Sequence, residues 1–516
     1  MFISTAIAAA AGSLPAAAEP PGPATSAQPA SGPATARAAR ASVPLAYAMA
    51  VRPAAPARPA LRYRLLPPPA DLTPGNAAPL YLTAAGLYPQ ADDAFVNKVL
   101  TDDEVRRFGL PDNKAENHTW SSLFLEVPLA ALATDPPELK QYLADTESAY
   151  RLLDIASRRE TCAWDLPLRE QGFDALLPHL NGMRRLATAA CVRARRAMAA
   201  GDVDAAVRAL RVDFAMAKAL DQQAVLVQEL VGVGIAALGL ARVRELAGLP
   251  DAPNLYWPLA DLPAPLLDVR RALETERALL AHTFPEMKKV RDGTFGEADW
   301  AALTERVGKL TRTVRSFWEN RPTIPPPGAL AERLGAVAAS AYLLPQARQY
   351  LASRGLTPAE LDALPPAVVL GRFVFGSYDE AYDEVVKWTA VPYAAARGRA
   401  AEARAVQRRL AAGASANPLF SIIPSVERAV ITSNQLARQV AAQQTVEALR
   451  AHAAGHGGIL PASLDALADS DTPVPPDPFT GRPFVYRPGD GGRSAVLESL
   501  VPERPTDGLV VTVNVR

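Results

Sequence analysis

The densest group of side chains that could carry chemistry is the segment FGSYDEAYDEVVKW, which begins at Phe375. Its carboxylates are Asp379, Glu380, Asp383 and Glu384. They form two pairs with a spacing of four residues, so on a helix each pair would share one face. Two close carboxylates can share a proton or bind a cation, which is chemistry that a hydrolase uses. The alternative is a solvated face on which Asp383 pairs with Lys387 while the aromatic rings pack inward.

Two other places offer possible metal ligands. His452 and His456 lie four residues apart and could present two ring nitrogens on one helical face. A zinc site needs further ligands, and Ala453 stands where a zinc protease has its glutamate. Asp477 in PPDPFTG and Asp490 in GDGG could bind calcium together, although an aspartate between prolines more often closes a turn. We therefore expect no cofactor and no metal, with helix-end and turn-forming roles for these residues.

The short motifs of common enzyme classes do not occur in the sequence. It has no G-x-S-x-G, S-x-x-K, H-E-x-x-H or G-x-x-x-x-G-K-[ST] and no acidic ladder of an EF-hand. GVGIAALG, with Gly232, Gly234 and Gly239, follows a helical pattern, so close helix packing explains it better than a dinucleotide loop. Lys and Arg total 54, as do Asp and Glu, so no positive charge favours nucleic acid as a partner.

The elements that must position these residues are mostly helices. From about residue 91 to 454, apolar residues recur at helical spacing between loops rich in Pro and Gly. In the clearest pair, Gly201 ends one helix and Asp202 caps the next. The sequence predicts a mainly α fold of antiparallel helical hairpins packed as a bundle. Within the helical domain, residues 61–420, a break between subdomains is expected near 320–328.

The C-terminal region, residues 421–516, combines a long helix with a small sheet. A helical pattern covers about residues 425–454. The runs FVYR, SAVLES and GLVVTVNVR then read as three short strands separated by turns. Three strands alone would be marginally stable, so we expect an antiparallel β-meander that caps the apolar side of the helix.

The first 60 residues are of low complexity and rich in Ala and Pro. An apolar stretch that ends in Ala-Ala-Ala before Glu19 is typical of a signal peptide, and a disordered linker should follow because large apolar residues are scarce. No later segment reaches about 18 uninterrupted apolar residues, so we expect no transmembrane span in the mature chain. These features predict an exported protein, periplasmic or at the cell envelope. There Cys162 and Cys191 would either pair or remain separate buried thiols.

Two resemblances depend on longer motifs. The order of LRYRLLPPPADLTPGNAAPLY, CAWDLPL, YDEVVKWTAVPY and PPDPFTGRPFVYR resembles a family of uncharacterised exported proteins from planctomycete-type bacteria, over nearly all of the chain beyond residue 60. This resemblance implies export and architecture but no reaction. GILPASLDAL followed by PPDPFTGRPFVYR is similar to the globular end of type II secretion pseudopilins, over about 60 residues. Those proteins begin with a hydrophobic membrane helix, whereas the helix here is polar and internal.

Together these features favour a non-enzymatic scaffold or protein-interaction protein of the cell envelope, with other envelope proteins as partners. Two alternatives stay open at this point. One is a hydrolase that uses the acidic cluster at residues 379–384. The other is a component associated with secretion, suggested by the pseudopilin-like C-terminal segment.

Overall fold

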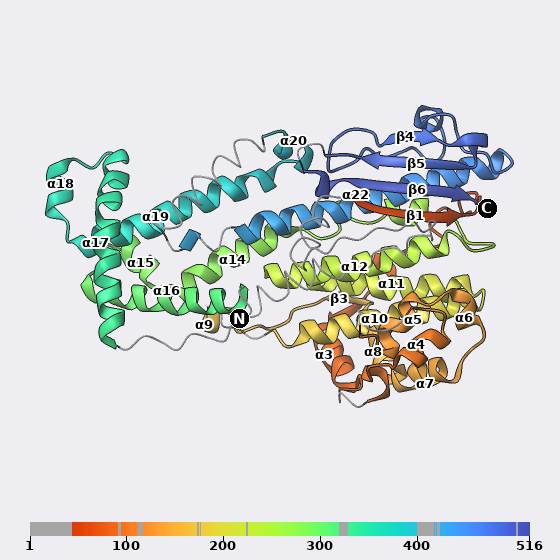
Figure 1. Cartoon of the computed structure of the whole chain (residues 1–516), viewed down its shortest axis with the longest axis horizontal. Coiled ribbons are helices and arrows are strands. Elements are labelled where there is room, and N and C mark those ends of the chain that lie inside the picture. The colour runs from red at the N-terminus through yellow and green to blue at the C-terminus, as the bar shows by residue number, and fades with distance from the viewer. Residues whose placement is uncertain are drawn as a thin grey trace, which may run out of the picture.

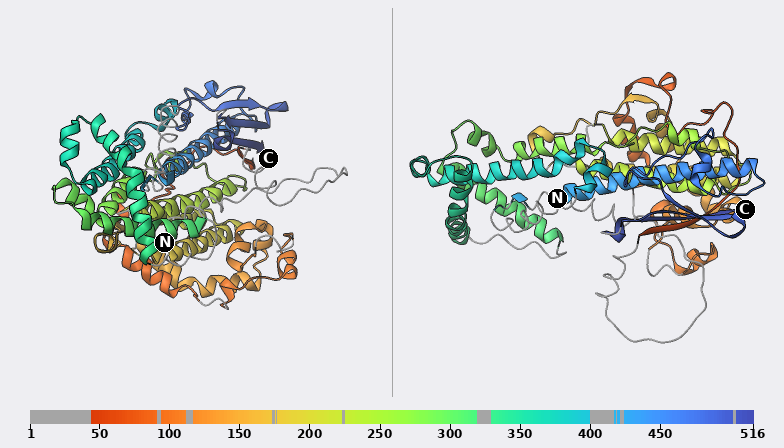
Figure 2. Two further views of the ribbon diagram at one scale, coloured as in Figure 1. Left: turned by 60° about the vertical axis from the view of Figure 1, so that its left-hand side comes forward. Right: turned by 90° about the horizontal axis from the view of Figure 1, so that it is seen from above.

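The computed structural model describes residues 44–516, except 91–93, 112–116, 173–174, 176, 223–224, 319–328, 400–416, 418, 421–423 and 502–503 (Figures 1 and 2). The fold is mainly α, as predicted. The helices of ten or more residues are α3 (Ala78–Leu87), α8 (Glu147–Ala156), α10 (His179–Ala199), α11 (Val203–Leu220), α12 (Leu226–Leu246), α14 (Val269–Thr283), α16 (Glu297–Trp318), α17 (Ala329–Ser353), α19 (Pro366–Val386) and α22 (Pro424–Gly455). The shorter ones are α4 (Asp102–Arg107), α5 (Trp120–Glu126), α6 (Leu129–Ala133), α7 (Pro137–Asp145), α9 (Leu168–Gln171), α13 (Tyr256–Ala260), α15 (Glu286–Arg291), α18 (Pro358–Ala363) and α20 (Tyr393–Gly398).

The predicted hairpin is α10 followed by α11. Gly201, in the turn between them, has a φ of +74°, a conformation that glycine adopts without strain. The side chain of Asp202 accepts a hydrogen bond from the backbone N–H of Ala205 at 2.8 Å and so caps α11. Local capping chemistry therefore determines where one helix ends and the next begins.

A four-stranded sheet, with the strand order β1-β6-β5-β4, covers the C-terminal half of α22. Its strands are β1 (Leu45–Val51), β4 (Val485–Pro488), β5 (Ser494–Ser499) and β6 (Leu509–Val515). β4, β5 and β6 form the predicted antiparallel meander. β1 adds to it as a parallel edge strand, with Leu45 opposite Leu509 and Val51 opposite Val515. A separate two-stranded ladder joins β2 (Thr73–Asn76) and β3 (Arg159–Thr161).

The prediction of a signal segment and disordered linker over residues 1–60 is wrong for β1. Residues 1–43 lie outside the described part of the chain. In β1, Met49 and Val51 are buried against the helical body while Ala46 and Ala48 are exposed. This alternation is that of a half-buried strand. Because alanines occupy its solvent face, however, the composition of the segment resembles that of the Ala-rich linker predicted around it.

Three apolar clusters hold the described elements together. The first core joins α3, α5, α8, α10, α11 and α12, and the second core joins α14 to α19. The cap core lies between the sheet and the C-terminal half of α22, as predicted, and includes Val51, Leu449, Leu497 and Val511. α22 reaches all three, because Ala429 belongs to the second core and Leu436 to the first. The break expected near 320–328 lies outside the described residues, and the two helical cores meet at α12 and α14 instead.

α12 is the one helix among the described residues that is long and apolar enough to cross a membrane. It packs against α10, α11, α14 and α22, and 78% of its most apolar stretch is buried. Gly232 and Gly239 allow this close packing. A Cβ at Gly232 would lie 3.1 Å from the Ala217 carbonyl oxygen, and one at Gly239 would lie 2.2 Å from Asp213 Oδ2. The predicted packing role of the glycine-rich segment is thus confirmed at these two positions.

Polar groups buried in the interior connect the cap to the body. Arg450 and Glu447 on α22 are both fully buried and form an ion pair. Glu447 accepts a hydrogen bond from the backbone N–H of Leu255 at 3.0 Å. Arg450 also donates to the backbone carbonyls of Arg52, Ala252 and Pro253. Cys162 and Cys191 are both buried and free, so the disulfide left open by the sequence does not form.

Candidate functional site

The acidic residues of α19 each face a cation. Asp383 lies 2.6 Å from Arg277 of α14. Asp379 lies 3.8 Å from the same guanidinium and 3.5 Å from that of Arg291. Burial raises the pKa of Asp379, although Arg277 and Arg291 act in the opposite direction. Asp379 and Asp383 therefore share a guanidinium rather than a proton.

The two glutamates of the cluster are paired separately. Glu380 accepts hydrogen bonds from Arg354 and, at 2.7 Å, from the hydroxyl of Tyr350. Burial acts to raise the pKa of Glu380, but these hydrogen bonds outweigh it, and the pKa is lowered. Glu384 lies 2.6 Å from Lys387. This arrangement is that of an ion-paired helix face, although Arg277 takes the place expected for Lys387 beside Asp383.

The two histidines stack on one another at the end of α22. The ring centroids of His452 and His456 are 3.8 Å apart and nearly parallel, and His456 Nδ1 lies 2.8 Å from the His452 carbonyl oxygen. One ring nitrogen is thus used at the helix end. Among the described residues, no group of three or more His, Cys, Asp or Glu side chains is placed to hold a metal ion.

Asp477 is fully buried and organises the PPDPFTG loop. Its carboxylate accepts hydrogen bonds from the Phe479 N–H, the Thr480 hydroxyl and the Ser499 hydroxyl. Gly481 completes the turn with a φ of +70°. The carboxylate of Asp477 is thus occupied by its own loop and by β5. Asp490 begins a 3-10 helix, Asp490–Gly492, in the loop between β4 and β5.

Phe479 anchors this loop to the helices. Its side chain is 1% exposed, and the guanidinium of Arg438 on α22 lies 4.4 Å from the ring centroid. The ring of Tyr393, on α20, lies 4.6 Å away. Arg438 also donates a hydrogen bond to the Asp507 carbonyl oxygen. The proline- and glycine-rich motif therefore fastens the sheet to α22 and α20.

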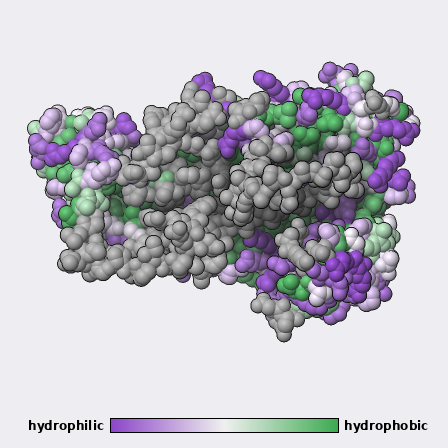
Figure 3. All heavy atoms as spheres, viewed as in Figure 1, coloured by the Kyte–Doolittle hydropathy of each residue, from purple (hydrophilic) through white to green (hydrophobic). Residues whose placement is uncertain are grey.

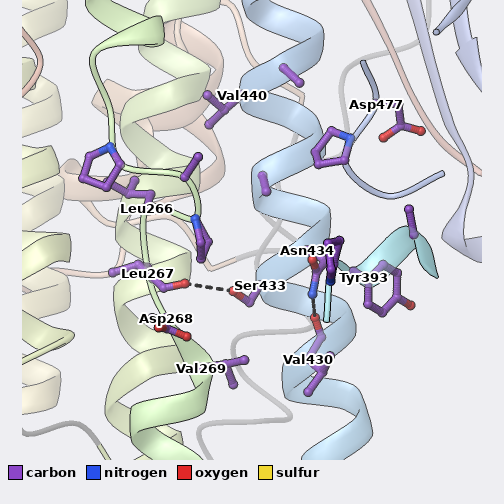
Figure 4. Close-up of a pocket in the computed structure, with 18 of the residues that line it drawn as sticks. Leu266, Leu267, Asp268, Val269, Tyr393, Val430, Ser433, Asn434, Val440 and Asp477 are labelled. Atoms are coloured by element: carbon purple, nitrogen blue, oxygen red, sulfur yellow. Dashed lines mark hydrogen bonds between the residues drawn. The ribbon is translucent and has the colours of Figure 1, made fainter. Parts of the chain in front are cut away.

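An elongated groove with a volume of about 690 Å³ lies beside α22 (Figure 4). Its floor is one face of α22: Val430, Ser433, Asn434, Ala437, Val440, Ala441 and Gln444. Its walls are residues 259–260 and 262–270, from the end of α13 to the start of α14, residues 388–394 before and in α20, and residues 475–478 with Gly481 of the PPDPFTG loop. From Val430 to Gln444 the floor extends for about 21 Å.

The groove is apolar with few polar groups. Its walls include Pro263, Pro265, Pro392, Pro475, Pro476 and Pro478. Ser433 donates its hydroxyl to the Leu267 carbonyl oxygen at 3.3 Å, and Asn434 donates its amide to that of Val430 at 2.7 Å. Asn434 Oδ1 accepts no hydrogen bond from any described residue. A concave apolar site with a few placed polar groups is the usual form of a binding pocket.

The sequence analysis missed this groove because its walls come from segments up to about 220 residues apart. Two local signals were present. Ser433, Ala437 and Ala441 place small side chains four residues apart on one face of the long helix. DLPAPLLD, which begins at Asp261, has two prolines and no charge between its aspartates, so it is unusually apolar for a loop.

Figure 3 shows the hydropathy of the described residues on one face of the molecule. Hydrophilic side chains dominate that face near α18 and near α4 and α7, with hydrophobic residues in small patches between them. Comparison with known proteins gives no relative from which a function could be transferred: no family model, no curated protein and no solved structure matches the chain.

Proposed function

We propose that the protein is a non-enzymatic scaffold or protein-interaction protein of the cell envelope. It holds an uncharged, apolar segment of another envelope protein in the α22 groove. The groove carries this proposal, because it is long and mainly apolar, its few polar groups are spaced along it, and its charged side chains are neutralised within the fold. Export is supported by the Ala-Ala-Ala site before Glu19.

The acidic cluster supports a non-enzymatic role. A hydrolase built on paired carboxylates needs one carboxyl group that keeps its proton near neutral pH beside a second, ionised one. Burial raises the pKa of Asp379, but this side chain lies between Arg277 and Arg291, which favour its ionised form. Asp383, Glu380 and Glu384 are each within hydrogen-bonding distance of an arginine or lysine. The cluster therefore serves to attach α19 to α14 and α17.

A secretion-associated role is the second candidate. α22 is followed by an antiparallel sheet, with the Asp477 loop between them, and this order supports the resemblance to pseudopilins. Against it, α22 is buried on several sides: Gln443, Val446, Leu449 and Arg450 are at most 1% exposed. A helix covered in this way has little surface left for packing into a filament.

Site-specific crosslinking in the source cells tests the proposal. A photo-reactive amino acid at Val391, which lines the groove and is 43% exposed, should give an adduct with an envelope protein. The same group at Val337, which is 67% exposed on α17, is the matched control and should not give it. Equal adducts from both positions, or an uncleaved protein in the cytoplasm, would contradict the proposal.

The hydrolase alternative has its own test. Asn or Gln in place of Asp379, Glu380, Asp383 and Glu384 should leave the Val391 adduct unchanged, because the cluster does not line the groove. A hydrolytic activity of the natural protein that this variant loses, with helicity intact by circular dichroism, would favour the hydrolase instead.

A further inference from the structure

The size, charge and lining of the α22 groove indicate which kind of apolar segment it binds. Building on the proposed function, we infer that the groove binds a proline-rich, uncharged polypeptide segment of its partner in the extended polyproline II conformation. Four properties of the described residues lead to this class of ligand.

The first property is the length of the groove together with its volume. The floor extends for about 21 Å, which a polyproline II segment of about seven residues spans at about 3.1 Å per residue. A volume of about 690 Å³ lies in the range of pockets that hold a drug-sized ligand. The groove therefore has room for one short segment.

The second property is charge. Asp268 and Arg270, at one end of the groove, form an ion pair at 2.6 Å and neutralise each other. Asp477 lines the groove, but three hydrogen bonds from its own loop and β5 occupy its carboxylate. A charged ligand side chain would lose its hydration without gaining a partner, so the bound segment is uncharged.

The third property is the supply of hydrogen-bonding groups. An ordinary extended peptide presents one N–H and one C=O per residue, and each must find a partner when it is buried. The carbonyl oxygens of Leu267 and Val430 already accept from Ser433 and Asn434, and few other polar side chains line the groove, so acceptors for buried N–H groups of a ligand are scarce. A segment rich in proline has fewer N–H groups to satisfy, and Asn434 Oδ1 remains as an acceptor for one that is left.

The fourth property is the aromatic lining. Trp388 and Tyr393 both line the groove, on the wall formed by residues 388–394 (Figure 4 labels Tyr393). The Trp388 indole N–H donates to no described residue, so it can donate to a carbonyl of the ligand. Aromatic-lined grooves are the recurring docking sites of polyproline II segments, whose carbonyls make no internal hydrogen bonds.

Fluorescence anisotropy with defined peptides and the full-length protein tests the inference. A labelled peptide of four Ala-Pro-Pro repeats should bind at least ten times more tightly than one of four Glu-Pro-Pro repeats. It should also bind more tightly than an alanine-based helical peptide. V391D places a charge on the exposed rim of the groove and should weaken binding of the neutral Ala-Pro-Pro peptide at least tenfold. V337D, on α17, is the matched control and should leave its affinity unchanged.

A437W fills the floor of the groove and serves as a second variant, with circular dichroism to confirm that it is folded. Equal affinity for neutral and acidic repeats, preference for the helical peptide, or no effect of V391D would overturn the inference. The crosslinking experiment distinguishes this failure from failure of the proposed function. If the Val391 adduct forms but maps to a partner segment without proline, the protein binds a partner in the groove as proposed, but the bound segment is not proline-rich.

Discussion

Glu276, on α14, is nearly buried, and its carboxylate accepts a hydrogen bond from the backbone N–H of Leu226 at the start of α12, at 2.9 Å. Burial raises the pKa of Glu276 from 4.5 to about 7, with the Leu226 N–H acting weakly in the opposite direction. After burial, the charge of Glu276 is a further cause that raises the pKa of Tyr378 and of Tyr382 on α19. The folded protein therefore holds a proton here that the unfolded chain releases.

The first prediction concerns the pH dependence of stability. Because the folded-state pKa of Glu276 is the higher one, its contribution is fully present below pH 4.5 and is lost as the pH rises to about 7. E276Q keeps the acceptor for Leu226 but cannot ionise. It should raise the free energy of unfolding at pH 8 by about 2–3 kcal/mol and change it little at pH 4.5.

Urea unfolding at both pH values measures this difference. E160Q changes an exposed glutamate in β3 and is the matched control, with no expected pH-dependent gain. An equal effect of E276Q at pH 4.5 and pH 8 would show that packing rather than ionisation governs this position. Glu229, with a pKa that burial and then Asp221 raise to about 9, should behave similarly when changed to Gln.

The second prediction concerns the buried ion pair of α22. R450A leaves the carboxylate of Glu447 buried without its partner and leaves the carbonyls of Arg52, Ala252 and Pro253 without a donor. We expect a loss of about 3–5 kcal/mol in the free energy of unfolding. R487A removes an exposed arginine that pairs with Glu498 and should cost less than about 1 kcal/mol. Similar losses in the two variants would contradict the role assigned to Arg450.

At this scale the sequence predicts residue types better than partners. Asp477 was correctly expected to close a turn, because Asx turns depend on neighbouring residues. The expected partner of Asp383 was Lys387, four residues away, whereas the structure places Arg277 there. Arg277 lies about 100 residues earlier on α14, so no spacing rule within α19 could have identified it.

Among the elements, those built from local patterns were predictable. The α10–α11 turn, the bounds of α22 and the meander β4–β6 follow from caps, helical periodicity and alternation. β1 was not predictable, because its alanines weaken the apolar alternation and its partner β6 lies far away in the sequence. Parallel strands are also not joined by a tight turn, so no turn motif indicates that β1 and β6 pair.

The third prediction tests the role of β1. Val51 is fully buried in the cap core, so V51D places a carboxylate in an apolar environment and should destabilise the cap strongly, by about 3 kcal/mol or more. A48D, on the exposed face of the same strand, should cost less than about 1 kcal/mol. Guanidinium unfolding followed by circular dichroism measures both. If V51D is as stable as A48D, β1 is not part of the sheet.

For the whole molecule, the shared helices predict cooperative unfolding. α12 belongs to both helical cores, and α22 reaches the first core, the second core and the cap core. Chains of this length often unfold in several steps, but here no core can separate without exposing one of these helices. The structure therefore favours one transition for the described elements.

The fourth prediction follows from this sharing. L210A, in the first core, and L497A, in the cap core, each remove a fully buried side chain and should cost about 2–5 kcal/mol. Both should shift the same calorimetric transition, with equal calorimetric and van't Hoff enthalpies. If calorimetry resolves two transitions and L497A changes the midpoint temperature of only one of them, the cap unfolds by itself.

The groove could not be predicted from the sequence, for a reason that belongs to this scale. Its floor is on α22 and its walls lie before α14, in α20 and in the PPDPFTG loop. A loop rich in proline usually marks a break between helices, so these loops predict helix ends rather than the walls of a binding site. Only the packing of α22 at the centre of the molecule brings these breaks together as walls.

The pairing of β1 with β6 has a consequence for biosynthesis. A ribosome makes β1 (Leu45–Val51) long before β6 (Leu509–Val515). An emerging polypeptide can assemble its helical hairpins early, but β1 has no strand to pair with until β6 has left the exit tunnel. A translation product truncated before β6 would thus carry an unpaired β1, which is the kind of exposed edge that quality-control proteases and chaperones recognise.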